Sequence, residues 1–114
     1  MRVKFSNKGA NLIVGLAGEL DHHCADYVKR KVDAEIFKST TKNIIFDFSK
    51  VNFMDSSGIG VIMGRFKNVQ KLNGKLAVVN PTPQIRRIFE LTGFQRIIPI
   101  YDSIENAYCS FNEH

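Results

Sequence analysis

Apolar and polar side chains alternate at the start of the chain, where Val3 and Phe5 stand between polar neighbours. A polar tripeptide that ends in Gly9 separates this segment from a more continuously apolar one at 12–17. Alternation with a period of two is typical of a strand with one exposed face, and a glycine-containing break between two such segments indicates a turn. The pattern therefore predicts an N-terminal β-hairpin.

After the hairpin the apolar positions take the spacing of helices. They recur every three or four residues over 25–36 and 59–69, with polar residues between them. This spacing predicts two amphipathic helices that each turn one face to the core. Asp21 is a candidate N-cap for the first helix, which we expect to end near Ser39. The second is expected to stop at the pair 73–74, Asn-Gly, which favours a left-handed helix end.

A third and a fourth helix are predicted mainly from the residues at their ends. Pro83 suits the first position of a helix, and Gly93 suits the residue just after its end. The helix between them carries its apolar residues at helical spacing. We expect Asp102 to cap the fourth helix, with Glu105 three residues on, although this capping motif prefers Ser or Thr at the cap.

Three further segments have the composition of strands. Residues 44–48 are almost entirely apolar, which is typical of a strand covered on both faces, as in parallel sheets. Residues 76–79 are interpreted as the next strand. Residues 97–100 form a shorter apolar segment, and Pro99 marks it as an edge strand. The stretch 49–55 is interpreted as the connection between the central strand and the second helix.

These elements predict the order β-β-α-β-α-β-α-β-α and a single α/β domain over residues 1–114 with a small mixed sheet. Right-handed crossovers place at least the first helices on one face of that sheet. The other face is therefore expected to be only partly covered.

Composition and charge limit the possible functions. The 114 residues are 44% hydrophobic and carry a formal net charge of +5, so a folded domain is expected rather than a disordered chain. A basic balance keeps a nucleic-acid-binding module as an alternative. The basic clusters at 29–31 and 86–87 have no aromatic residues interleaved with them. This arrangement favours solvated faces over a nucleic-acid surface.

The cysteines and the hydropathy pattern bear on the location. Cys24 and Cys109 lie far apart, and the N-terminal residues lead into a strand rather than a signal peptide. No apolar run reaches the roughly 18–20 residues of a membrane helix. We therefore expect a cytoplasmic protein with reduced thiols and no membrane insertion. Cys24 is expected to pack as a small hydrophobic side chain on the first helix.

Residues 53–60 carry the most informative motif. Asp55 and Ser56 are capping residue types at the predicted start of the second helix. Gly58 and Gly60 are poor choices for that position, costing roughly 1 kcal/mol each relative to alanine. We interpret both glycines as giving another surface close access to Ser57.

Other chemistries fit the same residues less well. Neither a dinucleotide fingerprint nor a phosphate-binding P-loop is present. A small serine-dependent hydrolase using Ser57, a histidine and an aspartate stays an alternative, but a carboxylate just before the nucleophile disfavours a developing oxyanion. His22 and His23 are adjacent, are expected to point in different directions, and have no third ligand at metal spacing. No metal and no cofactor are expected.

Four short motifs are similar to those of a known family. They are Gly18-Glu19-Leu20-Asp21, Asp55-Ser56-Ser57-Gly58-Ile59-Gly60, Asn80-Pro81 and Leu91-Thr92-Gly93-Phe94. The chain resembles the STAS domain family along nearly its whole length. Within that family it is most similar to the anti-sigma factor antagonists of early sporulation in endospore-forming bacteria. Transporter-linked members usually differ at these positions and carry membrane segments.

The resemblance implies a non-enzymatic switch that acts by binding. In such antagonists the unphosphorylated form binds an ATP-binding anti-sigma factor and thereby frees a sigma factor. The anti-sigma factor is also a serine kinase, whose target would here be Ser57, and a PP2C-type phosphatase restores the serine. We also expect the chain to be monomeric when free. The partner-binding positions that it implies are Asp21, Asp55, Ser56, Ser57, Gly58 and Ile59.

Overall fold

A five-stranded sheet, with its strands in the same order as in the sequence, organises the protein. The computed structural model describes residues 1–38, 40 and 42–112. The strands are β1 (Arg2–Lys8), β2 (Asn11–Leu20), β3 (Asn43–Met54), β4 (Leu76–Val79) and β5 (Ile100–Tyr101). Strands β1 and β2 pair antiparallel, whereas β3, β4 and β5 each pair parallel with the preceding strand. The predicted hairpin and mixed sheet are confirmed.

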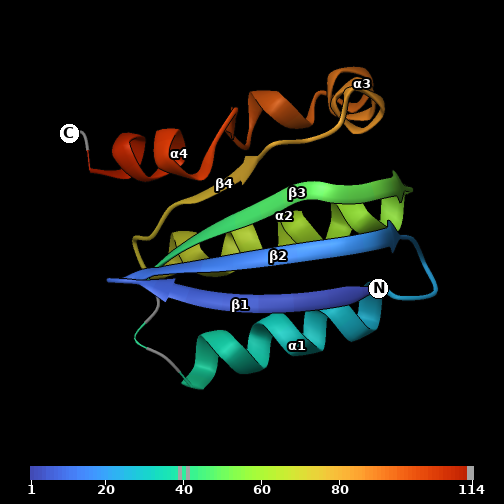
Figure 1. Ribbon diagram of the computed structural model, residues 1–114. Helices are drawn as coiled ribbons and strands as arrows, with labels where there is room; N and C mark the ends of the chain where they lie inside the picture. Colours follow the sequence, from blue (N-terminus) through green and yellow to red (C-terminus); the bar gives the residue numbers. More distant parts are fainter. Residues whose placement is uncertain (39, 41, 113–114) are drawn as a thin grey trace.

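Helices cover the two faces of the sheet unequally. They are α1 (Ala25–Lys38), α2 (Ser56–Lys71), α3 (Pro83–Thr92) and α4 (Ile104–Phe111), with a short 3-10 helix, η1 (Phe94–Arg96), after α3. The large core cluster takes side chains from α1, α2 and α3 and from one face of the sheet. On the other face, α4 is the one described helix that packs, against β3 and β4 through Ala107 and Phe111. In Figure 1 no helix lies in front of β1 and β2, so the expected partial exposure is confirmed.

Local sequence signals explain several helix ends. The Thr82 hydroxyl accepts a hydrogen bond from the Ile85 N–H and caps α3, which ends at Gly93 with a left-handed φ of 74°. After α2 it is Asn73 that takes the left-handed conformation, with a φ of 59°. The predicted end of α1 at Ser39 lies outside the described residues. No described helix is long and apolar enough to span a membrane.

Strand β3 is longer than predicted. The segment assigned to a connection at 49–55 is strand as far as Met54, and only Asp55 separates β3 from α2. Polar residues such as Ser49 and Lys50 obscure this extension in the sequence. They are tolerated because β2 pairs with β3 as far as Leu20, opposite Met54. Backbone pairing with a long neighbour therefore decides where β3 ends.

The last two sequence predictions also need correction. The strand expected at 97–100 is shorter and begins only at its last residue, as β5 (Ile100–Tyr101), because the turn after η1 brings the Ile98 N–H within 3.0 Å of the Phe94 carbonyl oxygen. The cap of α4 is Ser103, whose hydroxyl accepts from the Asn106 N–H at 3.0 Å. Asp102 instead pairs with Arg86 at 3.2 Å. The cap is therefore Ser103, the residue after Asp102, in agreement with the preference of this capping motif for Ser or Thr at the cap position.

Candidate functional site

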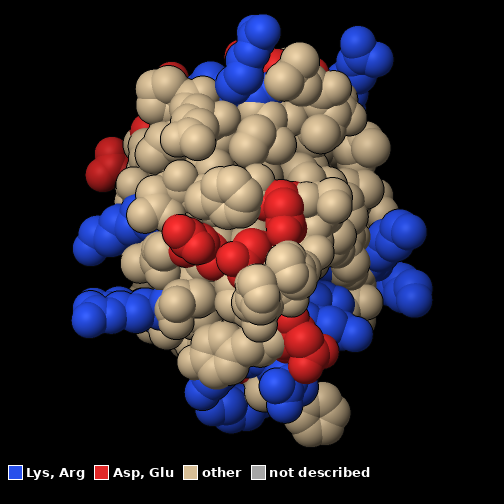
Figure 2. All heavy atoms as spheres, turned by 90° about the vertical axis from the view of Figure 1, so that its right-hand side faces the viewer, with Lys and Arg blue, Asp and Glu red and all other residues tan. Residues whose placement is uncertain are grey.

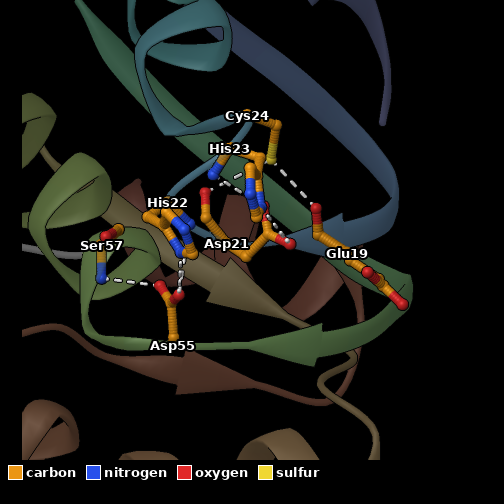
Figure 3. Close-up of polar contacts among 7 residues, drawn as sticks. All are labelled: Glu19, Asp21, His22, His23, Cys24, Asp55 and Ser57. Carbon is orange, nitrogen blue, oxygen red and sulfur yellow. Dashed lines mark hydrogen bonds and ion pairs between the residues drawn. The ribbon is translucent and has the colours of Figure 1, made fainter.

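Two neighbouring strands bring the predicted site residues to one edge of the sheet. Strands β2 and β3 run parallel and end side by side, since Leu20 pairs with Met54. The next residue on each chain segment is an aspartate, Asp21 after β2 and Asp55 after β3. Helices α1 and α2 both begin at this edge. The structure therefore brings together carboxylates that are 34 positions apart in the sequence, as Figure 3 shows.

Asp55 is the N-cap of α2 and also ties two loops together. Its Oδ1 accepts a hydrogen bond from the Ser57 N–H at 2.8 Å. Its Oδ2 accepts from the His22 N–H at 3.2 Å and lies 3.4 Å from His22 Nδ1. One carboxylate thus fixes the first turn of α2 against the turn between β2 and α1 (Figure 3). The predicted capping role of Asp55 is confirmed.

Asp21 caps a turn rather than a helix. Its Oδ1 accepts from the His23 N–H at 3.0 Å, and its carbonyl oxygen accepts from the backbone N–H groups of Cys24 and Ala25. Because α1 begins only at Ala25, Asp21 stands one turn too early to be its N-cap. The Asp21 side chain instead organises the turn that leads from β2 into α1. The predicted helix cap is corrected accordingly.

The two histidines lie against each other at this edge. Their ring centroids are 4.0 Å apart at an interplanar angle of 37°, so the expectation that they point in different directions is wrong. His22 Nδ1 faces Asp55, and His23 Nδ1 lies 3.7 Å from Asp21 Oδ2. Sequence reasoning missed these pairs. The pairing of β2 with β3 places His22 near Asp55, whereas His23 meets Asp21 within the same short turn.

Hydrogen bonds favour the ionised form of both aspartates. Partial desolvation acts to raise the pKa of Asp55, but hydrogen bonds from Ser57 and His22 outweigh it and hold the pKa below its ordinary value of 3.8. Desolvation likewise acts on Asp21, and the backbone N–H groups of His23 and Cys24, together with the His23 ring, lower its pKa overall. Both side chains therefore carry negative charge at neutral pH.

Charge is distributed unevenly around the site. Figure 2 views the right-hand side of Figure 1, where the arrowheads of β2 and β3 lie. Acidic side chains gather near the middle of this face, and basic ones stand around its rim. Glu19, Asp21 and Asp55 are the acidic residues at the ends of these two strands. A chain with a net charge of +5 thus presents an acidic centre at this edge.

Ser56 and Ser57 occupy the first turn of α2 in different ways. Ser56 is exposed, whereas Ser57 is half-buried beside a hollow between α1 and α2. Lys29 of α1 lines the same hollow. Arg65 closes its far end, where its Nε lies 3.0 Å from Asp33 Oδ1. Asp26 lines the hollow as well, so Ser57 borders a space with both basic and acidic side chains, while Ser56 faces solvent.

Gly58 and Gly60 do not share the role that the sequence suggests. Gly58 is buried, and a Cβ there would lie 2.6 Å from Met54 Cγ and 2.8 Å from the Leu20 carbonyl oxygen. It is therefore required by internal packing, which corrects the interpretation of outside access at this position. Gly60 is exposed with nothing within 4 Å of an added Cβ. Ile59, between them, packs partly against the core.

Cys24 lies at the same edge as the two histidines, as Figure 3 shows. The Cys24 side chain packs against the main core, as expected, although Cys24 lies one residue before α1 rather than on it, and its Sγ lies 3.0 Å from the Glu19 carbonyl oxygen. Both cysteines are free. Among the described residues, no group of three or more His, Cys, Asp or Glu side chains is arranged to hold a metal ion.

Comparison with known proteins agrees with this geometry. The family model of the STAS domain matches residues 3–107. The anti-sigma F factor antagonist of Paenibacillus polymyxa is 37% identical over 107 residues, which are 94% of this chain and 92% of that relative.

Solved structures give the same result. The unphosphorylated form of the anti-sigma factor antagonist SpoIIAA matches with a TM-score of 0.81 and 29% identity, over 94% of this chain and 93% of that one. SpoIIAA of Bacillus in its phosphorylated form matches with a TM-score of 0.73 and 28% identity, over 96% and 98% of the two chains. The resemblance found in the sequence motifs is confirmed: this chain belongs to the STAS domain family.

Proposed function

We propose that this protein is an anti-sigma factor antagonist that switches partners through Ser57. The unphosphorylated form binds an ATP-binding anti-sigma factor, and this frees a sigma factor in the cytoplasm. The anti-sigma factor acts as a serine kinase on Ser57, and a PP2C-type phosphatase reverses the modification. Support comes from the antagonist of Paenibacillus polymyxa, 37% identical over 94% of this chain, and from SpoIIAA, solved in both phosphorylated and unphosphorylated forms.

The environment of Ser57 is the observation that carries this proposal. Its backbone N–H is already held by Asp55, and no hydrogen bond of its hydroxyl is found in the described part of the chain. A phosphoryl group would add about −1.5 to −2 charges. The N-terminus of α2 and the nearby Lys29 offer that charge a favourable place. The fold is therefore expected to tolerate the phosphate.

The same charge would disrupt an interface at this edge. We expect the partner to cover Asp21, Asp55, Ser56 and Ile59, with Gly58 shaping the surface from beneath. A partner surface complementary to the acidic centre would carry basic groups close to both aspartates. A dianion on Ser57 would enter that interface beside two carboxylates and would be costly to desolvate. Binding is lost while the free domain, which we expect to be monomeric, stays folded.

The alternatives find less support at this edge. A serine hydrolase needs a base on the serine hydroxyl, but His22 Nδ1 faces Asp55 instead. A nucleic-acid-binding surface is disfavoured here because the centre of the edge is acidic. Neither alternative explains why the serine lies at the start of a helix beside the ionised Asp55.

Mapping the phosphorylation site tests the proposal. The purified chain is incubated with a candidate anti-sigma kinase and ATP, and the phosphate is located by peptide mapping. We expect it on Ser57. The matched control is Ser56→Ala, which should still be phosphorylated, whereas Ser57→Ala should not. Phosphate found mainly on Ser56 or Thr82 would show that the wrong hydroxyl has been assigned.

A further inference from the structure

A second hollow lies on the face of the sheet that α1 and α2 do not cover. Its volume is about 210 Å³, and it spans β1, β2 and β3. The hollow is here called the basic groove, and the residues that line it are Arg2, Lys4, Gly15, Leu16, Ala17, Asp47, Ser49 and Lys50. In Figure 1 this is the front of β1 and β2, where no helix lies. The basic groove is thus open to solvent.

Strand geometry explains why this face is hollowed. Successive side chains of a strand point to opposite faces, so Val14 and Leu16 enter the core while Gly15 and Ala17 form the floor of the groove. Both floor residues are small. The pairing of β2 with β3 is irregular here, because Gly15 pairs with Asp47 but Ala17 pairs with Lys50. The extra residue in β3 brings Lys50 to the wall of the groove.

The charges of the groove are not balanced internally. Arg2, Lys4 and Lys50 face one carboxylate, that of Asp47. Asp47 Oδ1 accepts a hydrogen bond from the Ser49 N–H at 3.0 Å. No ion pair of the three basic side chains is found within residues 1–38, 40 and 42–112. A surface with this excess of unpaired cations is complementary to an acidic ligand.

The spacing of the cations selects the shape of that ligand. Arg2 and Lys4 occupy alternate positions of β1, so they are about 7 Å apart along the strand. Alternate side chains of an extended peptide repeat at the same distance. The volume is also below the roughly 300–1,000 Å³ of small-molecule pockets. We propose that the basic groove binds an acidic segment of a protein partner in an extended conformation, with Asp or Glu at alternate positions.

The proposal is independent of the switch at Ser57. The groove uses the exposed face of the sheet, whereas Ser57 lies on α2, which packs on the opposite face. Occupation of the groove therefore does not require the kinase or the unphosphorylated serine. The two sites are separated experimentally with Ser57→Ala, which should bind an acidic peptide as well as the wild type does.

The test uses a labelled peptide of sequence Glu-Ala-Glu-Ala-Glu and the full chain at low salt. Binding is followed by fluorescence anisotropy, and ¹⁵N amide shifts locate the site. We expect shifts at Gly15 and Ala17. Gly15→Val should weaken binding about tenfold by filling the floor, because an added Cβ meets only Lys4 atoms at 3.9 and 4.0 Å. Removal of charge in the double variant Arg2→Gln and Lys4→Gln should weaken it by at least as much.

Controls define the outcomes that overturn the proposal. Lys67→Gln removes an exposed cation of α2, outside the groove, and should leave binding unchanged. Melting curves verify that each variant is folded, and the charge variant decides the test if Gly15→Val is not. Equal binding of the neutral peptide Gln-Ala-Gln-Ala-Gln, or no shifts at the floor residues, would overturn the proposal. So would an equal response to inorganic phosphate, or tighter binding of a short oligothymidylate by the same residues.

Discussion

The inner and outer sides of the first turn of α2 obey opposite constraints. On the inner side, Gly58 is packed so closely on Leu20 and Met54 that a Cβ has no room. On the outer side, Ser56 and Gly60 are exposed, and an added Cβ at Gly60 touches nothing. Two glycines of one motif, two residues apart, therefore have different roles. The inner one maintains the junction of β2, β3 and α2, and we propose that the outer one leaves space for a partner.

Replacing the inner glycine should have the largest effect on folding. In Gly58→Ala the new methyl group must displace both the Met54 side chain and Leu20, including the Leu20 carbonyl oxygen. We expect a loss of about 2–3 kcal/mol in the free energy of unfolding, because overpacking outweighs the better helix propensity of alanine. Chemical denaturation measures it. Unchanged stability would show that the junction yields easily and that Gly58 is not a packing residue.

Removing the charge of Asp21 should affect binding rather than folding. Asn caps a turn about as well as Asp, so Asp21→Asn should keep the hydrogen bond from the His23 N–H and melt near the wild-type temperature. Binding to the anti-sigma partner should weaken by roughly 1–3 kcal/mol if a basic partner group is well desolvated, and by less at an exposed rim.

The matched control for Asp21→Asn is Glu105→Gln, an exposed residue of α4. It removes the same charge away from the edge and should leave binding unchanged. If both variants bind like the wild type, Asp21 has only its role in the turn, and the partner surface is confined to the start of α2.

Replacing the outer glycine should have a smaller effect, of opposite sign on stability. Gly60→Ala adds a methyl group to an exposed helical position with no neighbour within 4 Å. The protein should gain about 0.5–1 kcal/mol from the better helix propensity. Binding should nevertheless weaken, because the methyl group occupies the approach to Ser57. A variant that is more stable and binds normally would contradict the assignment of Gly60 to the interface.

The acid dependence of stability should be the smallest of these effects. The pKa of Asp55 is lowered in the folded state, so its hydrogen bonds stabilise the fold above the unfolded pKa, near 3.8. That stabilisation is lost as the pH falls through the folded pKa. We expect the melting temperature of Asp55→Asn to change less than that of the wild type between about pH 5 and pH 3. Parallel curves for the two proteins would mean that this carboxylate does not contribute.

The sequence predicts elements best where the signal is local. The α3 helix is bounded as expected because Thr82 and Gly93 supply their caps within a few residues. Strand β3 is underestimated because its end depends on pairing with β2. Propensity shows that glycine is unfavourable at 58 and 60, but only the packing of β2 and β3 shows which one faces inward.

The same distinction applies to the chemistry of the surfaces. Asp55 and Ser57 stand out in the sequence because they belong to one short motif. The pairing of His22 with Asp55 depends on the neighbouring ends of two parallel strands. The basic groove escapes notice entirely, since Arg2 and Lys50 are far apart in sequence and form no charged run. Local patterns thus show candidate residues, whereas strand register decides which of them meet.

Binding before and after phosphorylation of Ser57 tests the central claim most directly. The anti-sigma partner is titrated with the unmodified chain, the phosphorylated chain and Ser57→Asp, and each sample is also melted. The account predicts nearly equal melting temperatures, since a helix start accepts negative charge, together with much weaker binding of both charged forms. A phosphorylated chain that binds as tightly as the unmodified one, or that loses binding because it unfolds, would contradict the account.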